Sequence, residues 1–396
     1  MILYRLLMAL ALLVMLLATL IGRWPKGAWR DRLGLTRTGP ADWWVHGASL
    51  GELTSVRAVI AALAATGAVH VTTNSATGRA LVADWGIARV TVGFAPFDAG
   101  GAAARLLAQL RPRALIVVEN EFWPARMAAC RKADVPVMVI GARMSERSAT
   151  RWRLAGGIMR QMLAGVSYLS AQDAASEARL VALGLPASVA GARMNLKAAV
   201  QAVPTAPGPL PRARTLLAAS THPGEEVLIL QAFMANRAGF DHLIIAPRHA
   251  TRGAEVARLI AATGLSFGRR STGAAPQADQ PVFLADTLGE MNRWYAMAGV
   301  TVIGGSFVGK GGHTPFEPAA HGSALLHGPS LHNFAEVFAA LGGADACIGV
   351  ADGAGLTAAL GELTPARQVH LAQNARATLT AGADVAGLVA DLIARA

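Results

Sequence analysis

The stretch with the densest concentration of reactive and ligand-binding residue types is 304–317, GGSFVGKGGHTPFE. Its glycines let backbone N–H groups approach a ligand closely, while Lys310, His313 and Glu317 bring charge and hydrogen-bonding groups to the same loop. The apolar run AGVTVI precedes it, and PFEPAAHG after it suits the first turn of a helix. A strand, a glycine-rich loop and a helix start in this order predict a phosphate-binding site.

Two other interpretations of this loop stay open. Residues 304–310 fit the G-x-x-x-x-G-K beginning of a P-loop, but Gly311 stands where a Ser or Thr would hold Mg²⁺, and no later strand ends in a suitable Asp. Alternatively, the glycines form a tight structural turn and bind nothing.

Carboxylates follow two apolar segments of the first half. Glu52 comes after WWVHG and a glycine turn, and Glu119 and Glu121 come directly after ALIVV. Charged residues at the carboxyl ends of parallel strands are typical of a ligand crevice. Glu52 is either a base or a helix cap: the helix dipole would lower its basicity, whereas desolvation in a closed site would raise it.

Strands and helices alternate in both halves of the chain, which predicts an α/β fold with parallel sheets. The proline-rich tract QAVPTAPGPLPRAR separates the halves and has the composition of a linker. We therefore expect four segments: a membrane anchor over 1–22, a first Rossmann-like domain over 23–203, a linker over 204–212 and a second Rossmann-like domain over 213–396. The terminal helix of the second domain would pack back on the first.

Composition narrows the class of protein. A chain of 396 residues with 53% hydrophobic and 15% charged residues is folded and long enough for two domains. The net charge of +11 favours an anionic partner, but the basic residues are scattered, without the lysine-rich tail or the basic and aromatic stripe of nucleic-acid binders. Two separated cysteines exclude a disulfide framework and a zinc site, and indicate a reducing compartment.

Residues 6–22 are uncharged and apolar, with Arg5 and Arg23 on either side. A helix of this length just spans a bilayer, and no small-x-small cleavage site precedes Arg23, so an uncleaved anchor is favoured over a signal peptide. The basic residues that follow predict that the rest of the chain lies on the cytoplasmic side, which means a single-pass membrane protein.

Two Rossmann-like halves joined by a proline linker and facing a central cleft are the layout of GT-B glycosyltransferases. The chain resembles the 3-deoxy-D-manno-octulosonic acid (Kdo) transferases of the lipid A pathway, glycosyltransferase family 30. The resemblance rests on long motifs in the family's order: WVHGASLGE, VTTNSATG, VENEFWP, ARMSERS, MNLK, AASTHPGEE, IAPRH, DTLGEM, GGSFVGKGGHTPFEPAAHG and HGPSLHNF.

This resemblance implies an inverting, metal-independent transfer of Kdo from CMP-Kdo to a lipid A precursor of the lipid IVA type, in lipopolysaccharide core biosynthesis. It implies no cofactor and no nucleic-acid partner. Glu52 matches the proton acceptor, and Glu119 and Lys197 match residues that assist the transition state. The positions that match the family's CMP-binding residues are Pro247, Arg248, Leu288, Gly289, Glu290, Thr314, Pro315, Phe316 and Glu317.

One position departs from the family pattern. Thr314 stands where the family usually has Asn, so a nucleotide contact made by that amide is in doubt. Two other functions remain as alternatives: a membrane-associated GT-B enzyme that uses a different nucleotide sugar, and a catalytically inactive lipid A binding protein.

Overall fold

The structure is a computed structural model that describes residues 28–99, 101–199, 202, 208–381 and 384–396, together with five residues nearer the N-terminus, Tyr4, Met8, Leu10, Ala11 and Val14. The predicted membrane anchor therefore lies mostly outside the described residues.

The chain forms two compact units, one of residues Met1–Ala199 with Gly382–Ala396 and the other of Val200–Ala381. The sequence predicted a linker over 204–212 and a second domain over 213–396 whose terminal helix packs back on the first domain. In the structure the boundary lies a few residues earlier, and residues 208–212 already belong to the second unit. The last 15 residues return to the first unit.

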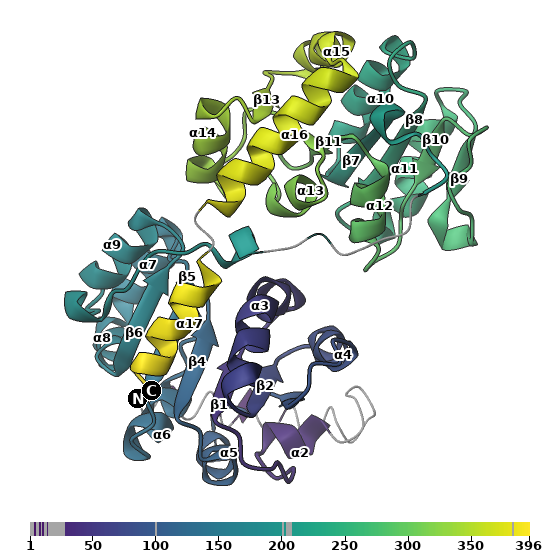
Figure 1. Ribbon diagram of the computed structural model, residues 1–396. Coiled ribbons are helices and arrows are strands. Elements are labelled where there is room, and N and C mark those ends of the chain that lie inside the picture. The colour runs from purple at the N-terminus through teal and green to yellow at the C-terminus, as the bar shows by residue number, and fades with distance from the viewer. Residues whose placement is uncertain are drawn as a thin grey trace. The chain divides into compact units, whose positions relative to one another are not determined.

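The described part of the first unit contains a six-stranded parallel sheet in the order β3-β2-β1-β4-β5-β6 (Figure 1). Its strands are β1 (Trp43–His46), β2 (Val69–Thr73), β3 (Val90–Phe94), β4 (Ala114–Val118), β5 (Val137–Ala142) and β6 (Val166–Ala171). Four of them, β1, β2, β4 and β5, are buried along their whole length, because helices cover both faces of a parallel sheet.

Helices alternate with these strands, as the sequence predicted. They are α2 (Ala28–Arg32), α3 (Leu50–Thr66), α4 (Ala76–Asp84), α5 (Ala102–Leu110), α6 (Pro124–Lys132), α7 (Glu146–Leu154), α8 (Gly156–Leu163) and α9 (Ala174–Ala182). Ala155 separates α7 from α8.

The last helix, α17 (Val385–Ala394), packs on α3 although more than 300 positions separate them in the sequence (Figure 1, yellow beside purple). Leu388 and Leu392 join the apolar core under α3, and the hydroxyl of Tyr168 donates to Asp391 over 3.1 Å. The terminal helix thus closes the first unit.

The second unit has a parallel sheet whose described strands follow the order β13-β12-β11-β7-β8-β10-β9. The strands are β7 (Thr215–Thr221), β8 (His242–Pro247), β9 (Phe267–Arg269), β10 (Val282–Leu284), β11 (Val300–Ile303), β12 (Ala324–His327) and β13 (Cys347–Gly349). The helices are α10 (Glu225–Ala235), α11 (Gly253–Ala261), α12 (Met291–Met297), α13 (Phe316–Ala320), α14 (Ala335–Gly343), α15 (Gly353–Glu362) and α16 (Pro365–Thr380).

The run Pro365–Ala394 is long and apolar enough to cross a membrane by length and composition alone. Its two parts instead contribute to the two cores. Leu371 of α16 is fully buried in the core of the second unit, and Leu392 of α17 is fully buried in the core of the first. This burial fits packing helices of a folded protein.

Candidate active site

The strand order brings the candidate residues of the first unit to one edge of its sheet. Strand β1 lies between β2 and β4, all parallel, so their carboxyl ends meet at the same edge. Glu52 follows β1, Asn74 follows β2, and Glu119 and Glu121 follow β4. Ligand groups of open α/β sheets gather at this edge.

Glu52 is the third residue of α3, and its carboxylate folds back over the start of the helix. One oxygen accepts the backbone N–H of Ala48 over 2.7 Å, and the other accepts the hydroxyl of Ser49 over 2.9 Å. Ser49 in turn is the N-cap and accepts the N–H of Glu52 over 3.3 Å. This reciprocal arrangement is a variant of the capping box in which the carboxylate reaches the N–H before the N-cap residue, so Glu52 has a structural role whatever else it does.

The pKa of Glu52 is nevertheless raised from 4.5 to about 7. Burial is the main cause, the two hydrogen bonds from Ala48 and Ser49 oppose it, and the negative charges of Glu119 and Glu121 add to it. Desolvation therefore outweighs the hydrogen bonds at the helix start. A carboxyl group that titrates near neutral pH is suited to general-base chemistry.

Glu119 is one of the described residues other than glycine that adopt a left-handed backbone, with φ of 58°. Its N–H donates to the carbonyl of Ile140 on the neighbouring strand over 2.9 Å, which helps to fix the turn after β4. A non-glycine residue in this region is strained, and such strain is concentrated at functional sites. The turn directs the chain so that Glu119 and Glu121 both act electrostatically on Glu52.

Glu121, a strand-end candidate without an assigned role in the sequence analysis, accepts or approaches several side chains at this edge. Its Oε2 accepts from Trp123 Nε1 over 2.7 Å and lies 3.4 Å from both Asn74 Nδ2 and His46 Nε2. Burial lowers the pKa of His46 to about 4, so this ring is neutral. Only the pairing of β1, β2 and β4 reveals that these residues meet.

Lys197 lies in a short 3₁₀ turn, Leu196–Ala199, and is half-buried. This turn packs against α3, the helix that begins with Glu52. The buried Leu196 of this turn packs closely on Gly141, where a Cβ atom would lie only 2.7 Å from Leu196 Cδ1. The structure thus ties the segment that carries Lys197 to the helix that carries Glu52.

The raised pKa of Glu52 leads to a pH prediction. A base acts only when deprotonated, so kcat/KM should rise with pH along an acidic limb with a midpoint near pH 7. Replacing Glu121 by Gln removes a negative charge that raises this pKa, and the limb should move to lower pH. An acidic limb that stays in place in Glu121→Gln would contradict the electrostatic coupling between Glu121 and Glu52. The matched control is Glu146→Gln, which changes an exposed carboxylate at the start of α7.

A cluster of basic groups occupies the corresponding edge of the second unit. Strand β7 lies between β8 and β11, and the chain continues from their carboxyl ends into His222, Arg248 with His249, and the 304–317 loop. His222 and His313 stack 5.1 Å apart, with their Nε2 atoms 2.9 Å apart, and the His249 ring lies 6.2 Å from that of His222. Segments from three strands therefore converge here.

The positive groups of this cluster disfavour the charged form of its histidines. Burial lowers the pKa of His313 to about 4, and the nearby His222, Arg248 and His249 lower it further. Lys310 also lowers the pKa of His222. Arg248 is exposed, and its side chain has no ion-pair partner among the residues that the structure describes. A group with this surplus of positive charge is suited to bind an anion.

A carboxylate of the protein itself binds the N–H groups of the glycine loop that a phosphate would otherwise bind. The fully buried Glu225 accepts the N–H groups of Gly305 over 2.7 Å, Phe307 over 3.0 Å and His222 over 2.9 Å. Gly305 has φ of 69°, and a side chain at Gly304 would meet the carbonyl oxygen of Ser220 at 2.3 Å. The glycines are thus required for close packing, and the loop serves mainly to position His313 and Lys310.

This geometry removes the P-loop interpretation. In a P-loop the helix begins directly after the Gly-Lys pair and its N–H groups surround phosphate. Here α13 begins only at Phe316, and Glu225 already occupies two of the loop's N–H groups.

The positions matched to CMP binding all follow strands of this sheet. Pro247 ends β8, Leu288, Gly289 and Glu290 follow β10, and residues 314–317 follow β11. Glu290 is paired with Arg270 over 2.8 Å, while Leu288 is 77% exposed. The hydroxyl of Thr314 donates to Glu317 over 2.7 Å. Phe316 is buried and lies against Phe334, so its side chain is not exposed to a nucleotide.

Among the described residues, no group of three or more His, Cys, Asp or Glu side chains has an arrangement that could hold a metal ion. The two edges instead differ in charge: carboxylates gather in the first unit and cations in the second. A base in one unit and an anion site in the other are the elements that a sugar transfer from a nucleotide donor requires.

Two Rossmann-like units, each a parallel sheet between helices, make up the GT-B fold. The chain is similar to UDP-GlcNAc 2-epimerase from Neisseria meningitidis, with a TM-score of 0.62, 10% identity and coverage of 89% of this chain and 99% of that one. It is also similar to HepE of Anabaena in complex with UDP-glucose, with a TM-score of 0.59, 12% identity and coverage of 89% and 99%. At these identities the likeness establishes the fold alone.

Sequence comparisons establish the family. Residues 27–200 match the family model described as 3-deoxy-D-manno-octulosonic-acid transferase (kdotransferase). The chain is 34% identical to 3-deoxy-D-manno-octulosonic acid transferase of Bordetella pertussis over 307 residues, which covers 74% of this chain and 72% of that protein. It is 30% identical to the Haemophilus influenzae transferase over 318 residues, covering 76% and 73%. The chain belongs to the 3-deoxy-D-manno-octulosonic acid transferase family and is a glycosyltransferase, as its motifs indicated.

Proposed function

We propose that the protein transfers Kdo from CMP-Kdo to a lipid A precursor of the lipid IVA type, with inversion at the anomeric carbon and without a metal ion. Family membership supports the sugar and the pathway of lipopolysaccharide synthesis. The observation that carries the mechanism is Glu52, a half-buried carboxylate with a pKa raised to about 7 at the carboxyl edge of the first sheet.

In this mechanism Glu52 removes the proton from a sugar hydroxyl of the acceptor as the hydroxyl oxygen forms a bond to the anomeric carbon of Kdo. The bond from that carbon to the CMP phosphate oxygen breaks, and the oxygen leaves with the electron pair. Attack on the face opposite the leaving group inverts the centre. Glu119 and Lys197 assist the transition state, in which positive charge develops on the sugar ring.

The basic cluster of the second unit binds the donor. Arg248 and Lys310 neutralise the phosphate as CMP departs, a task that Mg²⁺ performs in many other transferases. The stacked pair His222 and His313, which the lowered pKa values keep neutral, contributes ring N–H groups as hydrogen-bond donors. Pro247, Leu288, Gly289, Glu290, Thr314, Pro315, Phe316 and Glu317 would surround the nucleotide. No cofactor is needed for this reaction.

Arg248→Ala should weaken CMP-Kdo binding by about 1.5–3 kcal/mol, because a charge-assisted contact to phosphate is lost. Affinity for the lipid acceptor should stay unchanged. Titration calorimetry with CMP-Kdo measures the size of the effect, and titration with the lipid acceptor measures its selectivity. Arg258→Ala, an exposed arginine on α11, is the matched control, and undiminished CMP-Kdo affinity in Arg248→Ala would refute this placement of the donor.

Thr314→Asn is a companion change. The Thr314 hydroxyl already contacts Glu317, so the longer amide can keep this contact and add a donor toward the nucleotide. CMP-Kdo affinity should be maintained or increased, and a loss of more than tenfold would show that Thr314 does not occupy the family's amide position.

We also propose that residues 1–22 anchor the enzyme in the inner membrane with the catalytic units on the cytoplasmic side. The uncharged segment and the basic residues after it support this topology. Removal of residues 1–22 should shift the protein from the membrane to the soluble fraction in vesicle flotation and leave cooperative thermal unfolding intact. A truncated protein that still floats with vesicles would contradict the anchor.

A different nucleotide sugar is the main alternative, and an inactive lipid A binding protein is the second. Incubation with CMP-Kdo, UDP-GlcNAc and GDP-sugars, each with the same lipid acceptor, separates these functions. Turnover with CMP-Kdo alone is the expected result. Turnover with another donor, or lipid binding without any turnover, would replace the proposal.

A further inference from the structure

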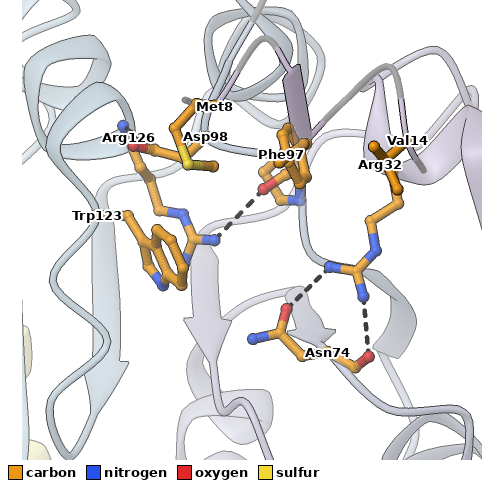
Figure 2. Close-up of a pocket in the computed structure, with 10 residues that line it drawn as sticks. Met8, Val14, Arg32, Asn74, Phe97, Asp98, Trp123 and Arg126 are labelled. Atoms are coloured by element: carbon orange, nitrogen blue, oxygen red, sulfur yellow. Dashed lines mark hydrogen bonds between the residues drawn. The ribbon is translucent and has the colours of Figure 1, made fainter. Parts of the chain in front are cut away.

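The first unit contains a cavity of about 370 Å³ that the proposed mechanism does not use (Figure 2). The loops after β2, β3 and β4 supply Asn74, Pro96, Phe97, Asp98 and Trp123 to its wall. The described residues Met8, Ala11 and Val14 of the N-terminal segment line it as well, and two arginines, Arg32 from α2 and Arg126 from α6, complete it. The cavity thus lies at the ligand-binding edge of the sheet.

Arg126 is the unusual member of this wall. It is only 2% exposed, and its guanidinium group stacks on the ring of Trp44 at 5.8 Å. Its Nη2 donates to the carbonyl of Pro96 over a long 3.5 Å, and its Nε and Nη1 have no hydrogen-bond partner among the residues that the structure describes. A buried cation with unsatisfied donors is unfavourable unless a ligand completes it.

The nearby carboxylates are committed elsewhere. Asp98 accepts the backbone N–H groups of Ala125 over 2.8 Å and Arg126 over 2.7 Å, and also the hydroxyl of Tyr4 over 2.5 Å. Glu121 is held by Trp123 and Asn74. The charges of Asp98 and Glu121 act on the Arg126 guanidinium, but among the described residues neither carboxylate lies within ion-pair distance of it.

Arg32 adds a second buried cation, 7% exposed. It donates to Asn74 Oδ1 over 2.9 Å and to the carbonyls of Asn74 over 2.8 Å and Ala95 over 3.1 Å, and the charge of Asp31 also acts on it. Burial, together with the charge of Arg126, lowers the pKa of Arg32 to about 10. The two guanidinium groups therefore repel each other, and an anion between them would relieve this repulsion.

The rest of the wall indicates what carries the anion. Pro96, Phe97 and Trp123 form an apolar part of the wall that does not depend on residues 1–22, so the cavity pairs two cations with an apolar surface. A phosphate group offers several oxygens to guanidinium donors, and an acyl chain next to it would contact the apolar residues. A phosphorylated lipid combines both features in one molecule.

The cavity also borders the candidate catalytic carboxylates. Asn74 and Trp123 stand in its wall and both donate to Glu121 Oε2, over 3.4 and 2.7 Å. The charge of Glu121 in turn raises the pKa of Glu52. A lipid held in the cavity would have its polar head beside the proposed base.

We propose that Arg126, with Arg32, binds a phosphate group of the lipid acceptor in this cavity and thereby positions the acceptor hydroxyl at Glu52. This inference rests on the proposed function, because it names the part of the acceptor that the first unit recognises. Arg126 and Arg32 are positioning residues, since they contact the phosphate and not the reacting atoms.

The test compares a lipid A precursor with the same lipid after removal of its phosphates, in detergent micelles. Binding is measured directly, without donor, by the fluorescence of Trp123 and its neighbours. The wild-type protein should bind the phosphorylated lipid at least about tenfold more tightly. Arg126→Met keeps the side-chain volume and removes the charge, so it should bind both lipids equally, at the affinity of the dephosphorylated form.

Controls separate this claim from folding and from the enzymatic proposal. Arg131→Met changes an exposed arginine on the same helix and should keep the preference for phosphate. Arg126→Lys retains one charge without the paired donors and should give an intermediate preference, which keeps the test valid if Arg126→Met unfolds. Inorganic phosphate at millimolar concentration should not displace the lipid.

The outcomes decide the inference whatever the enzyme transfers, because no step of the assay needs turnover. Equal binding of the two lipids by the wild-type protein would overturn it. So would an unchanged preference in folded Arg126→Met, or complete displacement by inorganic phosphate, which would make the cavity a site for the free ion. Failure of Kdo transfer with this preference intact would refute the proposed function only.

Discussion

Glu52→Gln should lower kcat by about 10²–10⁴-fold, the usual contribution of general-base catalysis. Glutamine has nearly the same size and retains one oxygen to accept a hydrogen bond at the start of α3, but it cannot take a proton. KM for CMP-Kdo should therefore stay close to the wild-type value, since the donor binds in the other unit. Steady-state kinetics with a phosphorylated lipid acceptor measures both constants.

The capping box makes a control necessary, because Glu52 also stabilises its helix. Ser49→Ala removes the other half of the box and should cost about 1 kcal/mol of folding free energy while most of the turnover remains. If Glu52 were only a cap, Glu52→Gln would resemble Ser49→Ala, with a small loss of stability and near-normal turnover. Thermal unfolding and kinetics on the two variants distinguish these roles.

Glu225→Ala should destabilise the second unit by about 3 kcal/mol or more, because three backbone N–H groups lose the acceptor that satisfies them. The 304–313 loop should lose its fixed position, and with it the contact between His222 and His313. CMP-Kdo affinity should fall for that reason although Glu225 itself is fully buried. Chemical denaturation and donor titration measure the two effects.

Glu362→Ala is the matched control, since Glu362 is exposed at the end of α15. Unchanged stability in Glu225→Ala would show that water replaces the carboxylate without cost. Unchanged CMP-Kdo affinity in a destabilised Glu225→Ala would show that the loop does not form the donor site.

The sequence predicted the parallel α/β organisation because each buried strand is a short apolar run that ends in glycine or charged residues. It did not predict the edge strands β9 and β13, which are three residues each and too short to show a pattern. It did not predict α6 either, because the apolar residues of PARMAACRK do not recur at helical spacing.

The site was predictable only in part, for a physical reason. Glu52, Glu119 and Arg248 follow apolar strands, and their positions alone mark them as candidates. The contacts of Glu121 with His46 and Asn74, and that of His222 with His313, depend on which strands are neighbours in the sheet. Local sequence does not contain this information, since strand order is set by tertiary packing.

The sequence also does not show which group binds the N–H groups of the glycine loop. The sequence shows the glycines that permit close approach of backbone N–H groups, but not what approaches. Glu225 lies some 80 positions earlier and fills that place. A phosphate-binding pattern and a carboxylate-held loop therefore look alike in the sequence.

The central claim is transfer of Kdo to a phosphorylated lipid by way of Glu52. Mass spectrometry of the lipid A precursor after incubation with CMP-Kdo tests it most directly, with the wild-type protein and Glu52→Gln side by side. The wild-type protein should yield a lipid product heavier by the mass of one or more Kdo residues, and folded Glu52→Gln should yield almost none in the same time. An unmodified lipid with the wild-type protein, or equal product with both, would contradict it.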